Sequence, residues 1–202
     1  ILAVFFAITI SFIYSSSRNM IILVLGGIIS SSLFSALLSI IKYGADTNDV
    51  LPAITYWLMG SLSFSTSSIV WNLTIPMLGG ILILIFFSKY LNALSLGDEE
   101  AKALGVNTKL LKLIIILVAT LISALSVILA GIIGWIGLII PHITRLLFGA
   151  DNKVILPMSA LIGAIFLLLV DNTSKLIFSF EIPIGIVTAI IGIPIFIFVL
   201  KN

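Results

Sequence analysis

The sequence predicts an all-α membrane protein, a polytopic bundle of transmembrane helices, and three observations support this fold class. Hydrophobic residues make up 61% of the chain and charged residues only 9%, against about 25% in a soluble domain. Mean hydropathy is +1.36. Apolar runs recur along the whole chain, whereas a signal peptide would give a single run at the start.

Seven apolar segments are predicted to span the membrane. They cover approximately residues 1–14, 20–41, 69–87, 109–130, 132–148, 154–177 and 183–200. The uncharged run 113–141 would reach about 44 Å as one helix, against about 30 Å of hydrocarbon, so it must contain parts of two spans. Residues 56–62 are apolar but short and aromatic, and they favour a short helix at the membrane interface.

We expect residues 1–202 to form a single transmembrane domain with a cytoplasmic segment at about 88–108. Residue 1 is Ile and lies inside an apolar run, which predicts that the chain is the C-terminal part of a longer protein. The Lys and Arg residues predict the orientation, because cytoplasmic loops are enriched in them. Alternating the spans places eight on one side, predicted to be cytoplasmic: Arg18, Lys89, Lys102, Lys109, Lys112, Arg145, Lys153 and Lys201. Lys42 and Lys175 fall on the outer side with Asp46, Asp49 and Glu181.

Several classes of function are disfavoured by what the sequence lacks. There are no cysteines, so disulfides and thiolate metal sites are excluded, and the single histidine, His142, supports a structural role better than a metal site or a pH switch. No basic stretch suggests nucleic acid as a partner. No phosphate-binding loop, Ser/His/Asp set or HExxH motif is present. We therefore expect no catalytic residues, no resident metal and no cofactor in this chain, and any ATP hydrolysis must occur on another chain.

The segment 88–108 carries the signals of a short helix outside the bilayer. Three acidic residues from Asp98 suit a helix N-terminus, Ser95 with Asp98 approximates a capping box, and Gly105 suits a C-terminal cap. Asn107 or Thr108 is expected to cap the next span. Two interpretations remain open, a solvated connector and a lever that docks into a groove of another protein and transmits its motion to the neighbouring spans.

These motifs resemble those of the iron-siderophore, haem and vitamin B12 (FecCD-type) ABC importer permeases, over essentially all 202 residues. Residues 96–106 resemble the coupling loop of that family, and residues 130–145 resemble the signature that follows it. The match continues in order through Leu156-Pro157, Gly163, 168–171 and 181–189, and Tyr56-Trp57 with Gly60-Ser61 resembles the family's external short helix.

The resemblance implies a permease of ten spans, of which seven would be present here, in the cytoplasmic membrane of a bacterium or archaeon. It also implies a second permease subunit (identical or a paralogue), cytoplasmic ATPase subunits and an extracytoplasmic substrate-binding protein, with membrane lipid around the spans. ATPase coupling would fall on Gly97, Asp98, Glu99, Glu100, Ala101, Lys102, Ala103, Leu104 and Gly105, with Arg145 as a minor contact. Lys175 would dock the binding protein, although a lysine lacks the bidentate geometry of the family's arginine.

Two questions stay open at this point. Glycines and serines in the spans favour close helix packing, and Gly131, Gly134, Gly137 and Pro141 could instead form the translocation pathway or a hinge. Asp171 could pair with Lys175 or act in a proton relay. An ion-coupled secondary transporter is the main alternative, and only Asp171 offers it support. A membrane-embedded enzyme comes next, but the sequence shows no cluster of catalytic side chains at membrane depth. The cargo stays open among ferric siderophore, haem, cobalamin and metal oxyanion.

Overall fold

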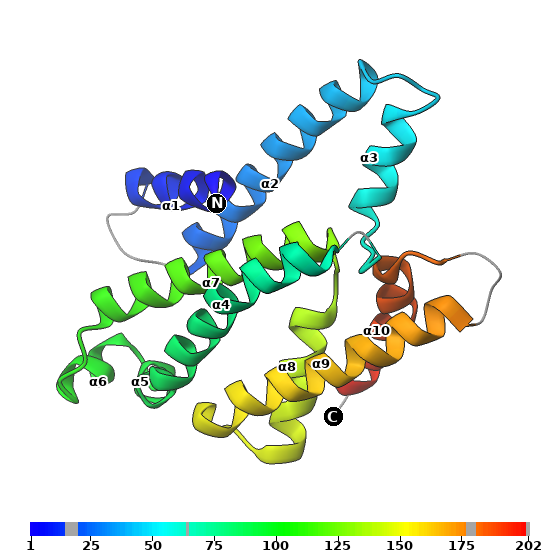
Figure 1. Ribbon diagram of the computed structural model, residues 1–202. Helices are drawn as coiled ribbons and strands as arrows, with labels where there is room; N and C mark the ends of the chain where they lie inside the picture. The colour runs from blue at the N-terminus through cyan, green and yellow to red at the C-terminus, as the bar shows by residue number, and fades with distance from the viewer. Residues whose placement is uncertain (15–19, 64, 177–180, 201–202) are drawn as a thin grey trace. The chain divides into compact units, whose positions relative to one another are not determined.

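The computed structural model describes residues 1–14, 20–63, 65–176 and 181–200, and within those ranges it consists of helices joined by short irregular segments, with no strand among them (Figure 1). The all-α prediction is therefore confirmed. In chain order the helices are α1 (Leu2–Tyr14), α2 (Met20–Tyr43), α3 (Val50–Leu58), α4 (Ser67–Phe86), α5 (Ser88–Ser95), α6 (Asp98–Ala103), α7 (Thr108–Ala130), α8 (Ile136–Phe148), α9 (Asn152–Leu176) and α10 (Ile184–Leu200). Arg18 and Lys201, which contributed to the predicted orientation, lie outside the described residues.

The chain forms two compact units, Ile1–Thr55 and Tyr56–Asn202. In the first unit α1 packs against α2. A side chain at Gly26 would come within 2.8 Å of the Ala7 carbonyl oxygen, and the Ser30 hydroxyl donates a 2.6 Å hydrogen bond to the Ala3 carbonyl. Small residues thus let two apolar helices approach closely, which is how helices associate where lipid removes the hydrophobic drive.

The short external helix was predicted too late in the sequence. Helix α3 covers Val50–Leu58, and an irregular segment follows it, starting at Met59. Asp49 precedes the first residue of this helix, and its carbonyl accepts the Ala53 N–H at 3.3 Å, while Gly60 ends the turn after the helix with φ +79°. The predicted range 56–62 therefore contains the end of the helix and the turn after it.

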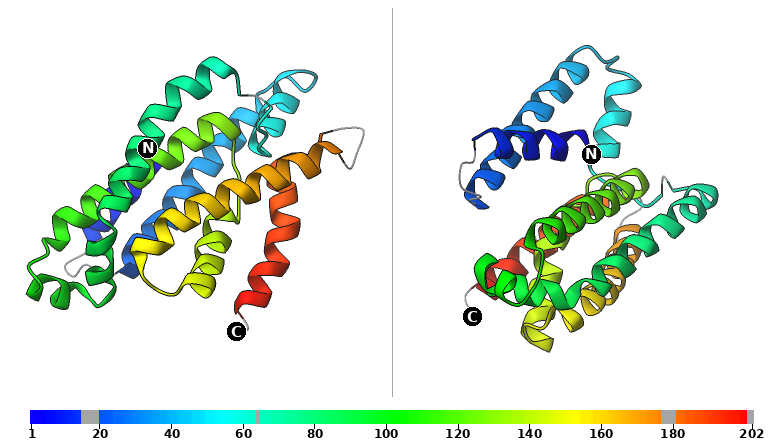
Figure 2. Two further views of the ribbon diagram at one scale, coloured as in Figure 1. Left: turned by 60° about the horizontal axis from the view of Figure 1, so that its bottom comes forward. Right: turned by 90° about the vertical axis from the view of Figure 1, so that its left-hand side faces the viewer.

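The second unit pairs α4 with α7 and packs α9 against both α8 and α10 (Figure 2). Gly80 of α4 receives the Ile122 side chain of α7, whose Cγ1 lies 2.8 Å from where a Cβ would stand. Ile139 and Ile140 of α8 are buried, as are Ile155 and Val170 of α9. These contacts hold the helices that lead to and from the 88–108 segment.

Helix α8 is shorter than the predicted span 132–148. It begins at Ile136, because residues 131–135 run as irregular backbone and Trp135 has φ +67°. Its 13 residues give a length of about 20 Å, less than a bilayer's hydrocarbon thickness. Residues 131–135 are uncharged like the helices on either side, so composition does not reveal the break, and the predicted start of this span at residue 132 is four residues too early.

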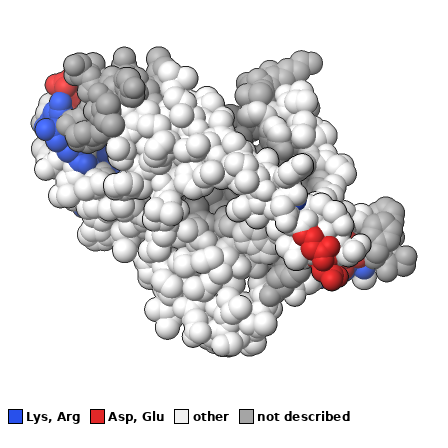
Figure 3. Space-filling view, turned by 90° about the horizontal axis from the view of Figure 1, so that it is seen from above, with Lys and Arg blue, Asp and Glu red and all other residues white. Residues whose placement is uncertain are grey.

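Within the part of the chain that the structure describes, four helices are long and apolar enough to cross a membrane: α2 over Val24–Tyr43, α4, α7 and α9. Helices α8 and α10 are apolar but shorter, and seven spans remains a prediction. Large apolar side chains stay exposed along these helices, for example Leu82, Leu168 and Ile190, and on the face seen in Figure 3 the charged atoms form only small groups. In lipid that surface is solvated, so the chain is a multi-pass membrane protein.

Three glycines at the end of the second unit away from α6 bring backbones into direct contact. Gly60, Gly131 and Gly185 form what we call the glycine crossing. The Gly60 carbonyl accepts the Ile184 N–H at 2.9 Å, and the Met59 carbonyl accepts the Gly185 N–H at 3.0 Å. A side chain at Gly131 would collide with the Trp57 carbonyl, and one at Gly185 with the Met59 carbonyl. Glycine is required there because no room remains for a Cβ.

Candidate functional site

The predicted cytoplasmic segment contains a helix that sequence analysis missed. Residues 88–95 form α5, which follows α4 almost without a break, since Phe87 ends α4 and its carbonyl accepts the first N–H groups of α5. Ser88 is buried and Lys89 lies 4.8 Å from the centre of the Tyr90 ring. This stretch mixes polar and apolar residues and is only two turns long, so neither length nor apolarity marked it as a helix.

The predicted capping box at Ser95 is wrong. Ser95 is the last residue of α5, and its hydroxyl donates to the Leu91 carbonyl at 2.9 Å. Gly97, with φ +122°, makes the turn into α6, and a side chain there would collide with the Glu100 carboxylate. Only glycine adopts that backbone conformation readily, so the reversal between the two short helices depends on it.

Helix α6 covers Asp98–Ala103, inside the predicted range 97–105, and its C-terminus is capped as expected. The Val106 N–H bonds the Ala101 carbonyl at 3.0 Å and the Gly105 N–H bonds the Lys102 carbonyl at 2.9 Å, with Gly105 at φ +81°. This pair of bonds is a Schellman motif, which satisfies two of the last carbonyls of the helix.

One face of α6 is buried and the other is exposed and charged. Ala101 is fully buried at 0% exposure, whereas the side chains of Glu99 and Lys102 are 85% and 48% exposed and form a 2.6 Å ion pair. An exposed pair at this spacing adds little stability. The charged side chains on the exposed face therefore contribute little to the stability of the fold and remain accessible.

An ion pair and a cap connect α6 to α7. Lys112 Nζ lies 2.6 Å from both carboxylate oxygens of Asp98, and each side chain is 38% exposed. Of the two predicted caps for the following span, Asn107 is the one used, since its side chain accepts the Leu110 N–H at 3.1 Å. A displacement of α6 would therefore act on the first turns of α7.

A second connection joins α5 to the start of α9. The Asn92 amide nitrogen donates to Asp151 Oδ1 at 2.6 Å, and the Asn92 amide oxygen accepts from the backbone and side-chain nitrogens of Asn152 at 2.9 and 2.8 Å. Asn92, Asp151 and Asn152 form what we call the Asn92 clasp. The hydrogen bond from Asn92, with a further one from the Lys153 N–H, lowers the pKa of the Asp151 carboxyl from its ordinary value. Sequence analysis missed this junction because its partners lie about 60 residues apart.

Arg145 is not joined to α6. It lies in the last turn of α8 with an exposed side chain, and no hydrogen bond or ion pair links it to α6 among the described residues. His142 lies one turn earlier on the same helix and is partly exposed. The residues that the structure describes contain no group of three or more His, Asp or Glu side chains that could hold a metal ion.

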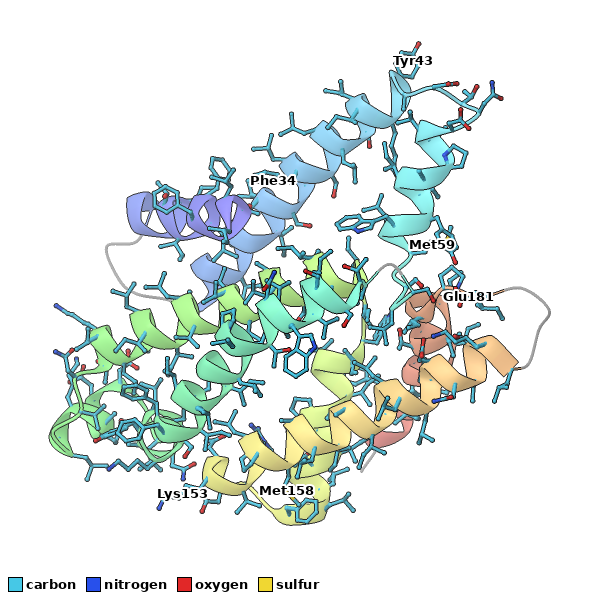
Figure 4. All side chains as sticks on the ribbon, viewed as in Figure 1. Phe34, Tyr43, Met59, Lys153, Met158 and Glu181 are labelled. Carbon is cyan, nitrogen blue, oxygen red and sulfur yellow. The ribbon has the colours of Figure 1, made fainter. Side chains whose placement is uncertain are left out.

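At the opposite end of α9 the acid–base pair expected from the sequence is present. Lys175 Nζ lies 2.8 Å from Asp171 Oδ2, with the Asp171 side chain 17% exposed and that of Lys175 40% exposed. Nearby, the Ser63 hydroxyl donates to Glu181 at 2.9 Å. Figure 4 shows Glu181 near one end of α9 and Lys153 at the other, so charged groups lie at both ends of this helix.

The four residues considered for a pathway or hinge have different surroundings. Gly131 belongs to the glycine crossing, whereas a Cβ at Gly134 or Gly137 would meet nothing within 4 Å. Between those two lies Trp135, and Pro141 is inside α8. The centres of the Trp135 ring and of the Phe196 ring in α10 lie 6.2 Å apart. A positive φ at a bulky residue is strained by about 1–3 kcal/mol and persists only where packing holds it.

Known proteins resemble this chain along nearly its whole length. The chain is 44% identical to the molybdate import system permease protein MolB of Haemophilus influenzae over 181 residues, which are 90% of this chain and 54% of that protein. It is 39% identical to a probable iron chelatin transport system permease protein of Helicobacter pylori (91% and 56% covered) and 36% identical to the cobalamin import system permease protein BtuC of Halobacterium salinarum (89% and 48%). The chain thus spans about half the length of these curated relatives.

A solved structure agrees with these relatives. It is described as an inward-facing conformation of a metal-chelate type ABC transporter, and it matches with a TM-score of 0.91 and 41% identity, covering 98% of this chain and 63% of the other. The model of the FecCD transport family matches residues 1–202. The resemblance found in the coupling loop and the following signature is therefore confirmed: the chain belongs to the FecCD transport family.

Proposed function

We propose that the chain is part of the membrane-spanning permease subunit of an ABC importer that takes up a metal chelate, with ATP hydrolysed on a partner subunit. Family membership and the permease names of the relatives support this proposal. The observation that carries it is the α5–α6 segment, a pair of short helices that exposes Glu99 and Lys102 while Ala101 anchors α6 and a Schellman motif ends it. A solvated connector would need neither the buried anchor nor the Schellman motif.

In the proposed mechanism a cytoplasmic ATPase subunit binds the exposed face of α6. ATP binding draws the ATPases together and displaces α6. The displacement reaches α7 through the Asp98–Lys112 ion pair, which links α6 to α7 across the short segment 104–107. The bundle then alternates between outward-open and inward-open states by a hinge or rocking motion. The residues proposed for ATPase coupling are 97–105, with Arg145 as a minor contact from the end of α8.

The outer end of the chain supports a second proposed contact, with an extracytoplasmic substrate-binding protein. Lys175 is 40% exposed on its side chain although it pairs with Asp171. A lysine held by one carboxylate still has N–H groups free to reach an acidic residue of a partner. A second permease subunit, identical or a paralogue, would complete the pathway, in the cytoplasmic membrane of a bacterium or archaeon.

The pathway or hinge residues divide into two proposed roles. Gly131 would be a fixed point, because its backbone is in contact with the Trp57 carbonyl. Gly134 and Gly137 would be the movable part, because each has open space where a side chain would stand and they flank the strained Trp135. Pro141 would add to this flexibility, since it leaves a carbonyl of α8 without its helical N–H partner.

The proposed cargo is a chelate of the ferric siderophore, haem or cobalamin class. The relatives are named for iron chelatin, cobalamin and, in one case, molybdate. A large, partly apolar chelate suits a chain whose spans carry few charges, since such a pathway offers apolar and small side chains and no fixed charge at mid-membrane. Uptake assays with a ferric hydroxamate, cobalamin and molybdate would separate these classes.

The test is a Glu99→Arg, Glu100→Arg double substitution in the full-length protein, co-purified with its ATPase. We expect ATPase association and uptake to fall together, because the reversed charges face the partner and the ion pair lost from Glu99 is exposed. The matched control is Asp46→Arg, Asp49→Arg, which makes the same charge change in the loop after α2 and should leave ATPase association intact. Undiminished association in the first variant would contradict the proposal.

A further inference from the structure

In the Asn92 clasp, the Asn92 side-chain amide makes three hydrogen bonds to Asp151 and Asn152 at the start of α9. One amide N–H of Asn92 goes to Asp151, and both lone pairs of its oxygen are taken by nitrogens of Asn152. Asparagine is suited to this position because it carries a donor and an acceptor on one rigid group. An aspartate there would lack the donor, and a serine would be too short to reach both partners.

The clasp is attached to the cap of α9 and so to the whole helix. Asp151 Oδ1 accepts the Lys153 N–H at 2.9 Å, and the Asp151 carbonyl accepts the N–H groups of Val154 and Ile155 at 3.0 and 2.9 Å. The residue that receives the Asn92 amide is therefore the residue that starts α9. A displacement of Asn92 would therefore displace Asp151, and with it the first turn of α9 that is hydrogen-bonded to Asp151.

Helix α9 continues from the clasp to the opposite side of the unit. Its 25 residues span about 37 Å, longer than the hydrocarbon of a bilayer, and end beside the Asp171–Lys175 pair. Among the described residues, every hydrogen bond from residues 88–106 to α9 or its cap goes through Asn92. Helix α5 also packs against α9, and Asn92 supplies the hydrogen bonds across that junction, to a helix that reaches the other end of the unit.

We propose that Asn92 is a positioning residue for transport: its amide ties α5 to the N-terminus of α9, so that a displacement of α5 shifts α9 as well. This inference rests on the proposed function, in which an ATPase displaces the α5–α6 segment. It adds a second route, through α9, to the one through Asp98, Lys112 and α7. Coupling of this kind is reciprocal, so a ligand bound at the far end of α9 would also bias α5.

The test measures the movement of α9 in the assembled transporter and needs no identified cargo. Residues 1–202 contain no cysteine, so spin labels can be placed at Leu161→Cys on α9 and Leu117→Cys on α7, both exposed, after any cysteine elsewhere in the full-length protein or the ATPase has been replaced. The full-length protein, assembled with its ATPase in lipid nanodiscs, is examined by double electron–electron resonance without nucleotide and with ATP and vanadate. With Asn92 intact, we expect the distance distribution to change on addition of ATP and vanadate.

Three variants then separate coupling from support of the fold. Asn92→Asp places two acceptors against each other and should reduce the nucleotide-dependent change about fivefold or more, a coupling loss of ordinary size. Asp151→Asn keeps an acceptor oxygen for the Asn92 amide and should behave as the parent. The double variant, Asn92→Asp with Asp151→Asn, exchanges donor and acceptor and should restore most of the change. If Asn92→Asp does not assemble, Asn92→Ala removes the bridge without adding a charge.

The outcomes that overturn the inference differ from those that overturn the proposed function. A parent protein that does not associate with the ATPase contradicts the proposed function. A parent that associates but shows no change between α7 and α9 contradicts the inference. The inference is also contradicted if Asn92→Asp shows the same nucleotide-dependent change in distance as the parent. It is contradicted as well if the double variant restores no more of that change than Asn92→Asp alone shows. Basal ATP hydrolysis, measured in parallel, should stay within about twofold in all variants, since none alters the face of α6 offered to the ATPase.

Discussion

The two ends of the unit formed by residues 56–202 are held by different kinds of contact. At the glycine crossing, backbone touches backbone through Gly60, Gly131 and Gly185, with no side chain between them. At the α5–α6 end, side chains make the connections: Asn92 to the cap of α9, and Asp98 to Lys112. Backbone contacts leave no rotamers to adjust, whereas side-chain contacts can lengthen, rotate or exchange partners.

This difference indicates which end can move. Packed backbones have few alternative arrangements, because interiors are dense and respond in discrete steps. Polar side chains that are one-third exposed or more can exchange protein partners for water at little cost. We therefore expect the glycine crossing to stay fixed while the α5–α6 end is displaced.

The largest effect is expected from Gly131→Ala. The new Cβ would collide with the Trp57 carbonyl, and φ +68° is unfavourable for alanine, so we expect a loss of about 3 kcal/mol or more of stability. Thermal unfolding in detergent, followed by size-exclusion chromatography, measures it. Gly134→Ala is the matched control, because nothing lies within 4 Å of its Cβ position, and it should remain near the parent. Equal stability of the two variants would remove the contrast between the ends.

A smaller effect is expected from Asn107→Ala at the start of α7. The Asn107 side chain accepts the Leu110 N–H, and losing such a cap costs about 1 kcal/mol. Thermal unfolding of Asn107→Ala against the parent would show this loss. Asn107→Asp keeps an acceptor at the same position and should retain most of the stability, so a large loss in that variant would point to another role for this side chain.

These results bear on what the sequence could predict. The bounds of α2, α4, α7 and α9 were predicted within a few residues, because apolar runs bounded by charged or polar residues carry a strong signal. Gly105 was predicted as a cap from its residue type alone, and Asn107 was one of two caps predicted for α7, the other being Thr108. The start of α8 was missed, since a strained turn at Trp135 leaves no mark in composition.

The candidate site was predicted in part. The charged face of α6 follows from local order along the chain, and so does the pairing of Asp171 with Lys175. The Asn92 clasp does not, because hydrogen bonds between residues 59 or 60 positions apart depend on how α4, α5 and α9 fold back on one another. Ser95 was misplaced for a related reason: its position in a short, weakly apolar helix was not visible.

Asp98→Ala should have a smaller effect on stability than Asn107→Ala. The Asp98 and Lys112 side chains are each 38% exposed, so water screens their attraction and the loss should stay below about 1 kcal/mol. Reversing the pair, Asp98→Lys with Lys112→Asp, should restore what either single change loses. The measurement is the unfolding temperature at low and high salt, and an effect that ignores salt would contradict an electrostatic origin.

The smallest effect on stability is expected from protonation of Asp151 at low pH. Because the pKa of Asp151 is lowered in the folded state, its contribution is present above the ordinary value near 3.8 and is lost as pH falls through the lowered value. The difference in unfolding temperature between the parent and Asp151→Asn should be constant from pH 7 to 5 and shrink on further acidification. A difference that grew as pH fell would contradict the sign of this shift.

The packing of Trp135 against α10 constrains how related sequences can vary. A Cβ at position 192 would lie 3.2 Å from the Cβ of Trp135 and 2.5 Å from Ile139 Cδ1. The Ile139 side chain and the Cβ of Trp135 therefore leave little room for a side chain at position 192, and replacing Gly192 would require a smaller residue at 139 and a shift at 135 together. In a large set of homologous permeases, positions 135, 139 and 192 should consequently change in concert, with bulk at one compensated by its removal from another.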